Sequence, residues 1–212
     1  MREQNVIDFY LICYRLKDTI RSGWKDWKVK KERLESVAEH IYSTQMLAIA
    51  VNSEFKYNLD MYKVIYLIAI HELGETIIGD VTPFAMDRAE KKRIEREAVH
   101  NLLSMLVDKD ELESLFVDFD DCLSKEAKFA KQCDKLECCL QAKIYDQDKL
   151  IDLTIQDDNA TYHDDEVQSL LNSGDSFSDM WLKWHKEHDG FDDNFKQIID
   201  YMIANGVFIS QS

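Results

Sequence analysis

The chain is organised around the apolar run Val64–Ile70 (VIYLIAI), which leads directly into the polar sequence His71–Glu75 (HELGE). A run that is so uniformly apolar is typical of a buried helix, because a solvent-facing helix carries polar residues on one side. We expect this helix to span residues 60–78, with its first residue as the N-cap. His71 and Glu75 are four residues apart and would share one face of it. Buried polar side chains need partners, so a site is expected here.

A second histidine lies upstream in a similar setting. Ser36-Val37-Ala38-Glu39 has the spacing of a capping box, in which the serine and the glutamate close the start of a helix. His40 follows in the first turn of that predicted helix. A lone histidine on an apolar face is more commonly a hydrogen-bonded core residue than a ligand. Two such histidines beside the carboxylate of Glu72 make a site for Zn, Mn, Fe, Co or Ni an equal alternative.

The sequence disfavours a zinc protease of the thermolysin type. That motif needs a second histidine four residues after the first, and Glu75 stands there.

Asp134 is a further candidate. It lies among apolar neighbours within a predicted helix over residues 124–145. A carboxylate in that position must be ion-paired, protonated or bound to a metal. Pairing with Lys131 or Lys135 and ligation of a metal are both open from the spacing alone.

The segment 23–34 is rich in lysine and tryptophan within an otherwise acidic chain. One interpretation is a solvated basic loop that is held in place by two indole rings. The other is a wall of a substrate site, in which Arg21 binds a phosphate or a sugar and Trp24 offers a flat surface. The sequence alone leaves both open.

Composition limits the fold and the partners. The chain has 212 residues, of which 45% are hydrophobic, with one proline and six glycines, and this is typical of a mostly helical protein with one sizeable core. The net charge of −15 argues against a nucleic-acid polymer or an anionic membrane as partner. A small anionic substrate stays possible because a bound cation dominates the local field.

The cysteines and the N-terminus indicate a cytoplasmic protein. Five cysteines, two of them adjacent and none in a CxxC pair, do not form a disulfide framework and suggest a reducing compartment. No signal peptide and no apolar span of membrane length is found in the sequence.

Four motifs occur in an order that resembles a known family. They are Arg21–Trp24, Glu35–His40, His71–Pro83 and Lys128–Glu137. The chain resembles the HD-domain phosphohydrolases over about residues 5–150, and within them the branch of 5′-deoxynucleotidases. The resemblance implies an all-α fold, an HD-domain helical bundle over residues 1–150. Residues 151–212 would be a helical extension packed on this core rather than a separate domain.

The resemblance also implies the site. One divalent ion (Mn, Co, Mg, Zn, Fe or Ni) would be held by His40, His71, Glu72 and Asp134. Glu72 departs from the family pattern, which has aspartate at this position. The longer side chain displaces the carboxylate by about 1 Å, where metal sites tolerate a few tenths of that.

The remaining implied roles concern catalysis and substrate. Glu75 matches the family's general acid/base, and Asp80 matches a residue that organises the water or the substrate. Arg21 and Trp24 would bind the sugar of a deoxyribonucleoside 5′-monophosphate, and a homodimer is implied. Two alternatives remain: an HD-type hydrolase of another nucleotide phosphoester, and a degenerate nucleotide-binding protein without activity.

Overall fold

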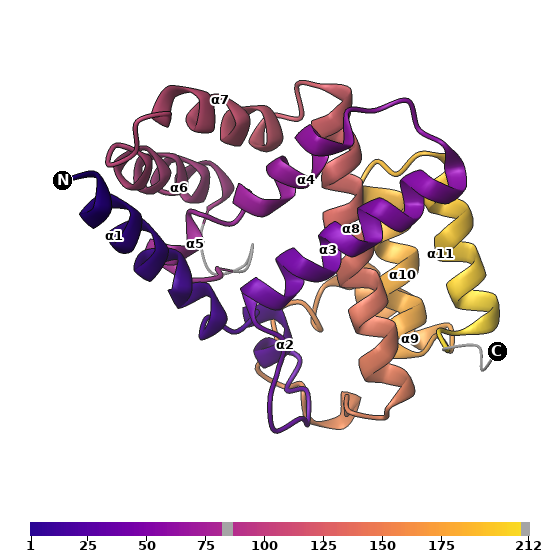
Figure 1. Ribbon diagram of the computed structural model, residues 1–212. Helices are drawn as coiled ribbons and strands as arrows, with labels where there is room; N and C mark the ends of the chain where they lie inside the picture. Colours follow the sequence, from indigo (N-terminus) through magenta and orange to yellow (C-terminus); the bar gives the residue numbers. More distant parts are fainter. Residues whose placement is uncertain (82–86, 209–212) are drawn as a thin grey trace. The chain divides into compact units, whose positions relative to one another are not determined.

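The computed structural model describes residues 1–81 and 87–208 of the chain (Figure 1). Within these ranges every regular element is a helix, and the one pairing of extended backbone is an isolated bridge between Ile20 and Ser36. The predicted all-α fold class is confirmed. No helix of the described part is long and apolar enough to cross a membrane. The sequence also predicts a turn over residues 80–84 around Pro83, and residues 82–84 of it lie outside the described residues.

The helices in chain order are α1 (Arg2–Tyr14), the 3-10 helix η1 (Arg15–Lys17), α2 (Ser22–Asp26), α3 (Val37–Phe55), α4 (Met61–Ile70), α5 (Glu75–Ile78), α6 (Arg88–Leu103), α7 (Lys109–Asp120), α8 (Lys125–Gln147), the 3-10 helix η2 (Leu153–Ile155), α9 (Asp165–Asn172), α10 (Phe177–His188) and α11 (Asp193–Asn205).

The chain divides into two compact units. The first comprises Met1–Gly23 and Leu34–Lys131, and the second comprises Trp24–Arg33 and Gln132–Ser212. Helix α8 runs through the division, with its first residues in one unit and the rest in the other. The domain boundary that the sequence analysis places near residue 150 stays a prediction.

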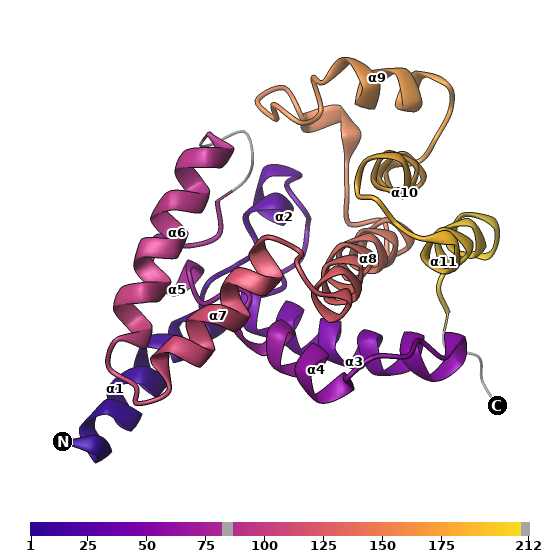
Figure 2. The ribbon, with the colours of Figure 1, turned by 90° about the horizontal axis from the view of Figure 1, so that it is seen from above.

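The first unit is built on two pairs of packed helices. Helix α3 packs along α4, and α6 packs along α7 (Figure 2). A buried apolar cluster forms a core in this unit, to which α4, α6 and α7 and the turn after α4 contribute Ile70, Leu73, Val99, Leu102, Leu103, Leu112 and Phe116. Phe9 and Ile12 bring one face of α1 onto this core.

Both predicted helix starts are confirmed. The Ser36 side chain accepts a hydrogen bond from the Glu39 amide, and the Glu39 carboxylate accepts one from the Ser36 amide at 2.9 Å. This capping box satisfies backbone donors that the first turn of α3 leaves open. Asp60 caps α4 by accepting from the amides of the second and third residues of that helix.

The prediction of one helix over residues 60–78 is wrong, because α4 ends at Ile70 and α5 begins at Glu75. In the intervening turn, amide groups bond to carbonyl oxygens three residues back instead of four. Gly74 lies directly against α6, where a Cβ atom added to it would be 3.0 Å from Cγ of Glu95. The close approach of α6 therefore favours a glycine at position 74, which lies in the turn between α4 and α5.

The second unit contains α9, α10, α11, most of α8 and the segment Trp24–Arg33. The Trp27 side chain is buried, and its ring centroid is 4.7 Å from that of Phe177. Lys30 Nζ ion-pairs with Asp152 at 2.8 Å. The lysine- and tryptophan-rich segment is therefore fixed to its own unit by buried indoles and ion pairs, as the first of its two interpretations expects.

Candidate active site

Two buried histidines lie in the first unit with their rings close together. His40 is fully buried in the first turn of α3, and His71 is the C-cap of α4. Their ring centroids are 5.6 Å apart. His71 Nδ1 lies 2.7 Å from the Ile68 carbonyl oxygen, which only accepts, so this nitrogen carries the hydrogen and donates. His71 Nε2 is then the nitrogen with the lone pair, which is the arrangement that a metal ligand needs.

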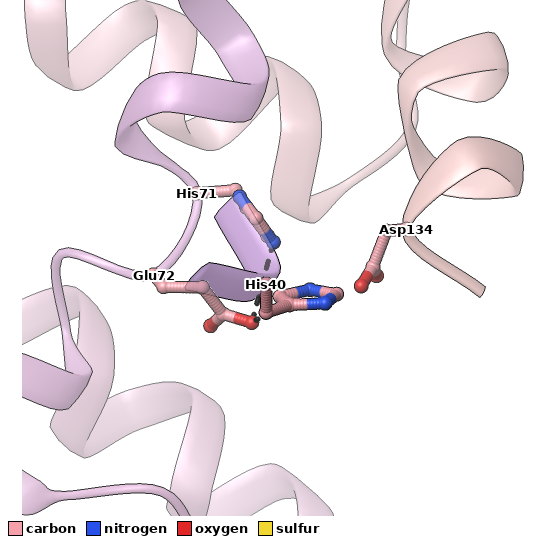
Figure 3. A group of neighbouring side chains, drawn as sticks. All are labelled: His40, His71, Glu72 and Asp134. Atoms are coloured by element: carbon pink, nitrogen blue, oxygen red, sulfur yellow. Dashed lines mark ion pairs between the residues drawn. The ribbon is translucent and has the colours of Figure 1, made fainter. Parts of the chain in front are cut away.

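Glu72 directs one carboxylate oxygen at both rings (Figure 3). Its Oε1 atom is 3.2 Å from His71 Nε2 and 3.9 Å from His40 Nε2. An imidazole lone pair repels a carboxylate oxygen unless a proton or a cation lies between them. The donor set of imidazole nitrogen and carboxylate oxygen therefore fits a divalent cation. The longer glutamate reaches this position from the turn that follows α4.

Asp134 lies on helix α8 and belongs to the second unit. The first unit ends on the same helix, at Lys131. It is buried, and its Oδ2 atom lies 3.9 Å from Lys135 Nζ, at the outer limit of an ion pair. The histidine and carboxylate side chains that could hold a metal ion include Asp134 together with His40, His71 and Glu72 (Figure 3).

Glu75 is a buried carboxyl group near these residues. As the first residue of α5 it does not share a regular helix face with His71. Burial raises the pKa of the Glu75 carboxyl well above its usual range, and the charges of Glu72 and Asp80 raise it further. Its Oε2 atom is buried and has no hydrogen-bond partner among the described residues. A buried carboxyl with a raised pKa and an open oxygen is suited to exchange a proton with a substrate.

Asp80 is held by the backbone. Its Oδ2 atom accepts a hydrogen bond of 2.6 Å from the Ser22 amide, at the start of α2. Arg21 precedes this contact, and its Nη1 atom lies 3.4 Å from Glu72 Oε1. The structure therefore brings Arg21, Glu72 and Asp80 together within the first unit.

Trp24 lies in the second unit, and its side chain is only 3% exposed. Its ring contacts Tyr145, at a centroid distance of 5.2 Å, and Trp181, at 5.7 Å. The assignment of Trp24 to the sugar stays a prediction.

Sequence reasoning considered Lys91, with Lys92 and Arg93, as a residue near the substrate but did not assign it to the site. Lys91 Nζ donates a hydrogen bond of 2.8 Å to the Val81 carbonyl and lies 3.4 Å from Glu95 Oε1. The run of charged residues on α6 predicts a solvated face, which hides this contact. Gly74 is a signal in the sequence, since a glycine inside a predicted helix can mark a close approach of another element.

Comparison with known proteins identifies relatives. The family profile described as "HD domain" matches residues 13–171. A protein of Dictyostelium discoideum named 5′-deoxynucleotidase HDDC2 is 34% identical over 152 residues, which cover 68% of this chain and 78% of that protein. The human protein of the same name is 31% identical over 146 residues, 68% of this chain and 69% of its own length.

Solved structures share the fold. The crystal structure of a predicted metal-dependent phosphohydrolase from Magnetospirillum magnetotacticum superposes with a TM-score of 0.65 at 18% identity. The match covers 97% of this chain and 92% of that one. A conserved hypothetical protein from Pyrococcus furiosus gives a TM-score of 0.58 at 26% identity, over 78% of this chain and 90% of that one.

Proposed function

The chain belongs to the HD domain family, and on that premise we propose that it is a divalent-metal-dependent phosphomonoesterase that acts on deoxyribonucleoside 5′-monophosphates. The observation that carries the proposal is the convergence of His40 Nε2, His71 Nε2 and Glu72 Oε1. The names of the relatives, which are 5′-deoxynucleotidases, support the substrate class. The products would be a deoxynucleoside and inorganic phosphate.

The residues that would hold one divalent ion are His40, His71, Glu72 and Asp134. Their donor set suits Mn, Co, Mg, Zn, Fe or Ni. When bound, such an ion lowers the pKa of a water and offsets negative charge on the phosphoryl group. Donation by His71 Nδ1 to the Ile68 carbonyl would keep the ring turned with Nε2 toward the ion.

Glu75 would carry the proton in the reaction. The water oxygen bonds to phosphorus while the bond between phosphorus and the 5′-oxygen breaks, and the leaving oxygen takes the proton of the Glu75 carboxyl. A proton from the attacking water then returns the carboxylate to its starting form. The raised pKa of Glu75 supports this role, because a carboxyl whose pKa is shifted upward is better suited to act as a general acid.

Arg21 and Asp80 would position the substrate. The Arg21 guanidinium, mostly buried beside Glu72, could donate to a phosphate or sugar oxygen. The Asp80 carboxylate, fixed by the Ser22 amide, would orient the water or contact the sugar. Trp24 stays the proposed contact for the sugar, and because its side chain is 3% exposed and packs on Tyr145 and Trp181, it would offer the sugar only an edge of the ring.

A substrate panel tests this function. We expect faster phosphate release from dAMP than from AMP, and little hydrolysis of cyclic AMP, dATP or a pyrophosphorylated guanine nucleotide. Hydrolysis of one of the last three in preference to dAMP would favour the alternative of an HD-type hydrolase with another phosphoester substrate.

The substitution Glu72→Asp distinguishes an active metal site that is adapted to glutamate from an inactive site. It restores the aspartate that the family pattern has at this position. In a site adapted to glutamate, the shorter side chain withdraws the carboxylate by about 1 Å, which is more than metal geometry tolerates. We expect the variant to lose at least about 10-fold in phosphate release and in metal affinity. A gain of activity in the variant would support a degenerate, non-catalytic protein instead.

We also propose that a second copy of the chain packs on α1. One face of this helix meets the core, yet none of its residues is buried, and its other face exposes Val6, Ile7, Tyr10, Leu11 and Tyr14. Glu3, Ile7, Tyr10 and Tyr14 follow the 4-3-4 spacing of a coiled-coil seam. In an antiparallel pair of α1 helices centred on Tyr10, Glu3 of each copy would approach the 3-10 helix η1 of the other copy, which carries Arg15 and Lys17.

Substituting Tyr10→Glu should convert a dimer into a monomer, because it places like charges at the centre of that seam. Sedimentation measures the mass of each species. The control is Tyr62→Glu on α4, where an equally large tyrosine is 92% exposed outside α1. Dimers of unchanged stability in the Tyr10 variant, or a wild-type monomer at micromolar concentration, would contradict the interface.

A cytoplasmic location is proposed as well. All five cysteines are free, which supports a reducing compartment.

A further inference from the structure

Lys91 connects α6 to the segment that follows α5. Its Nζ atom donates a hydrogen bond of 2.8 Å to the Val81 carbonyl oxygen and lies 3.4 Å from Glu95 Oε1 on its own helix. The side chain is about three-quarters buried, with 24% of its surface exposed. An ammonium group in such a position is held by directed contacts rather than by a solvent shell.

The bond to Val81 is one of two anchors around Asp80. On one side Lys91 holds the carbonyl of the next residue, and on the other the Ser22 amide holds the Asp80 carboxylate at 2.6 Å. Gly79 precedes Asp80 with φ +75°, in the region that only glycine adopts freely. The backbone at Gly79 can therefore adopt several conformations. The orientation of the Asp80 carboxylate then depends on the two contacts, Lys91 with the Val81 carbonyl and the Ser22 amide with Asp80.

Lys91 also lies among carboxylates that would otherwise repel one another. Glu95 packs against Gly74, and burial raises the pKa of its carboxyl while Lys91 opposes that rise. The charge of Lys91 likewise opposes the raised pKa of Glu75, together with that of Arg21. The charge of Lys91 therefore offsets the negative charge of two carboxyl groups, that of Glu75 at the start of α5 and that of Glu95 on α6.

We propose that Lys91 is a positioning residue: it holds the Val81 carbonyl, and through it Asp80, in the arrangement that phosphate ester hydrolysis requires. The inference rests on the proposed function for its link to catalysis. In this role Lys91 acts through its contacts with Val81 and Glu95 and not through the substrate.

The first test compares Lys91→Met, Lys91→Arg and Lys92→Met in the metal-loaded full chain. Lys92 is the matched control, because it is the next residue on α6 and pairs instead with Asp121 at 2.7 Å. We expect Lys91→Met to lower kcat for dAMP by about 10- to 100-fold, since small misplacements of catalytic groups cost that much. KM and metal content should stay within about 3-fold. Lys91→Arg, which keeps a cationic donor, should recover most of the rate, and Lys92→Met should be near wild type.

The second test needs no activity. The Ser22 amide hydrogen, which Asp80 accepts, reports whether Asp80 is held, and its exchange with solvent can be followed by NMR. We expect Lys91→Met to speed this exchange by at least about 10-fold, and Lys92→Met to leave it unchanged.

Several outcomes overturn the inference. These are unchanged Ser22 exchange in Lys91→Met, equal loss of kcat in the Lys91 and Lys92 variants, or a loss of kcat that follows a loss of metal or of folded protein. If wild-type protein hydrolyses no nucleotide while Ser22 exchange still depends on Lys91, the proposed function fails and the anchoring of Asp80 stands.

Discussion

His71→Ala is expected to remove both the metal and the activity. The substitution deletes one of the two imidazole nitrogens that converge on Glu72 Oε1, at 3.2 Å and 3.9 Å. Loss of a group that merely orients a ligand already costs 10- to 100-fold in affinity or activity, so loss of a ligand should cost on the order of 100-fold or more. Metal content after dialysis and phosphate release from dAMP are the measurements.

His100→Ala is the matched control for this prediction. His100 lies on α6, is largely exposed and pairs with Glu113 at 3.0 Å. This variant should keep the metal content and the rate of the wild type. Wild-type metal content and rate in His71→Ala would contradict the assignment of the site.

Glu75→Gln should stop the reaction while leaving the ion in place. Glutamine is nearly the same size but neither gives nor takes a proton, and proton transfer by a positioned side chain contributes about 10²- to 10⁴-fold. We therefore expect kcat for dAMP to fall within that range, with metal content unchanged. Glu97→Gln, at an exposed position of α6 that pairs with Arg93, is the control and should keep the wild-type rate. A decrease in kcat of less than about 3-fold would contradict a role of Glu75 in proton transfer.

The same variant should change how stability depends on pH. The folded-state pKa of Glu75 is raised above its unfolded value by burial and by Glu72 and Asp80. Its protonated form therefore contributes stability that is fully present below the unfolded pKa and is lost as pH rises through the folded one. In metal-free protein, Tm should fall less for Glu75→Gln than for wild type between pH 5 and pH 8. Parallel curves would contradict the raised pKa.

Local rules in the sequence predicted the parts of the fold that depend on neighbouring residues. The capping box at Ser36 and the cap at Asp60 follow from spacing, and the structure has both. The apolar run before His71 predicted a buried helix, and α4 buries Val64, Leu67, Ile68 and Ile70. Tyr66 and Ala69 of the same run are exposed, so the helix is buried on one side only.

Contacts between distant segments account for the rest. Nothing local in His71–Glu75 prevents a continuous helix, and the interruption coincides with the close approach of α6 at Gly74. The burial of Trp24 depends on Tyr145 and Trp181, more than a hundred residues away in the sequence. Lys91 has the same local pattern as its solvent-facing neighbours and differs from them by reaching Val81.

Phosphate release from dAMP by metal-stripped protein, before and after Mn²⁺ or Co²⁺ is added back, tests the central claim most directly. We predict no release from the stripped protein and full recovery as about one equivalent of metal binds, with none in His71→Ala. Equal release with and without metal would contradict a metal-dependent phosphomonoesterase, and so would the absence of release from dAMP with every divalent metal.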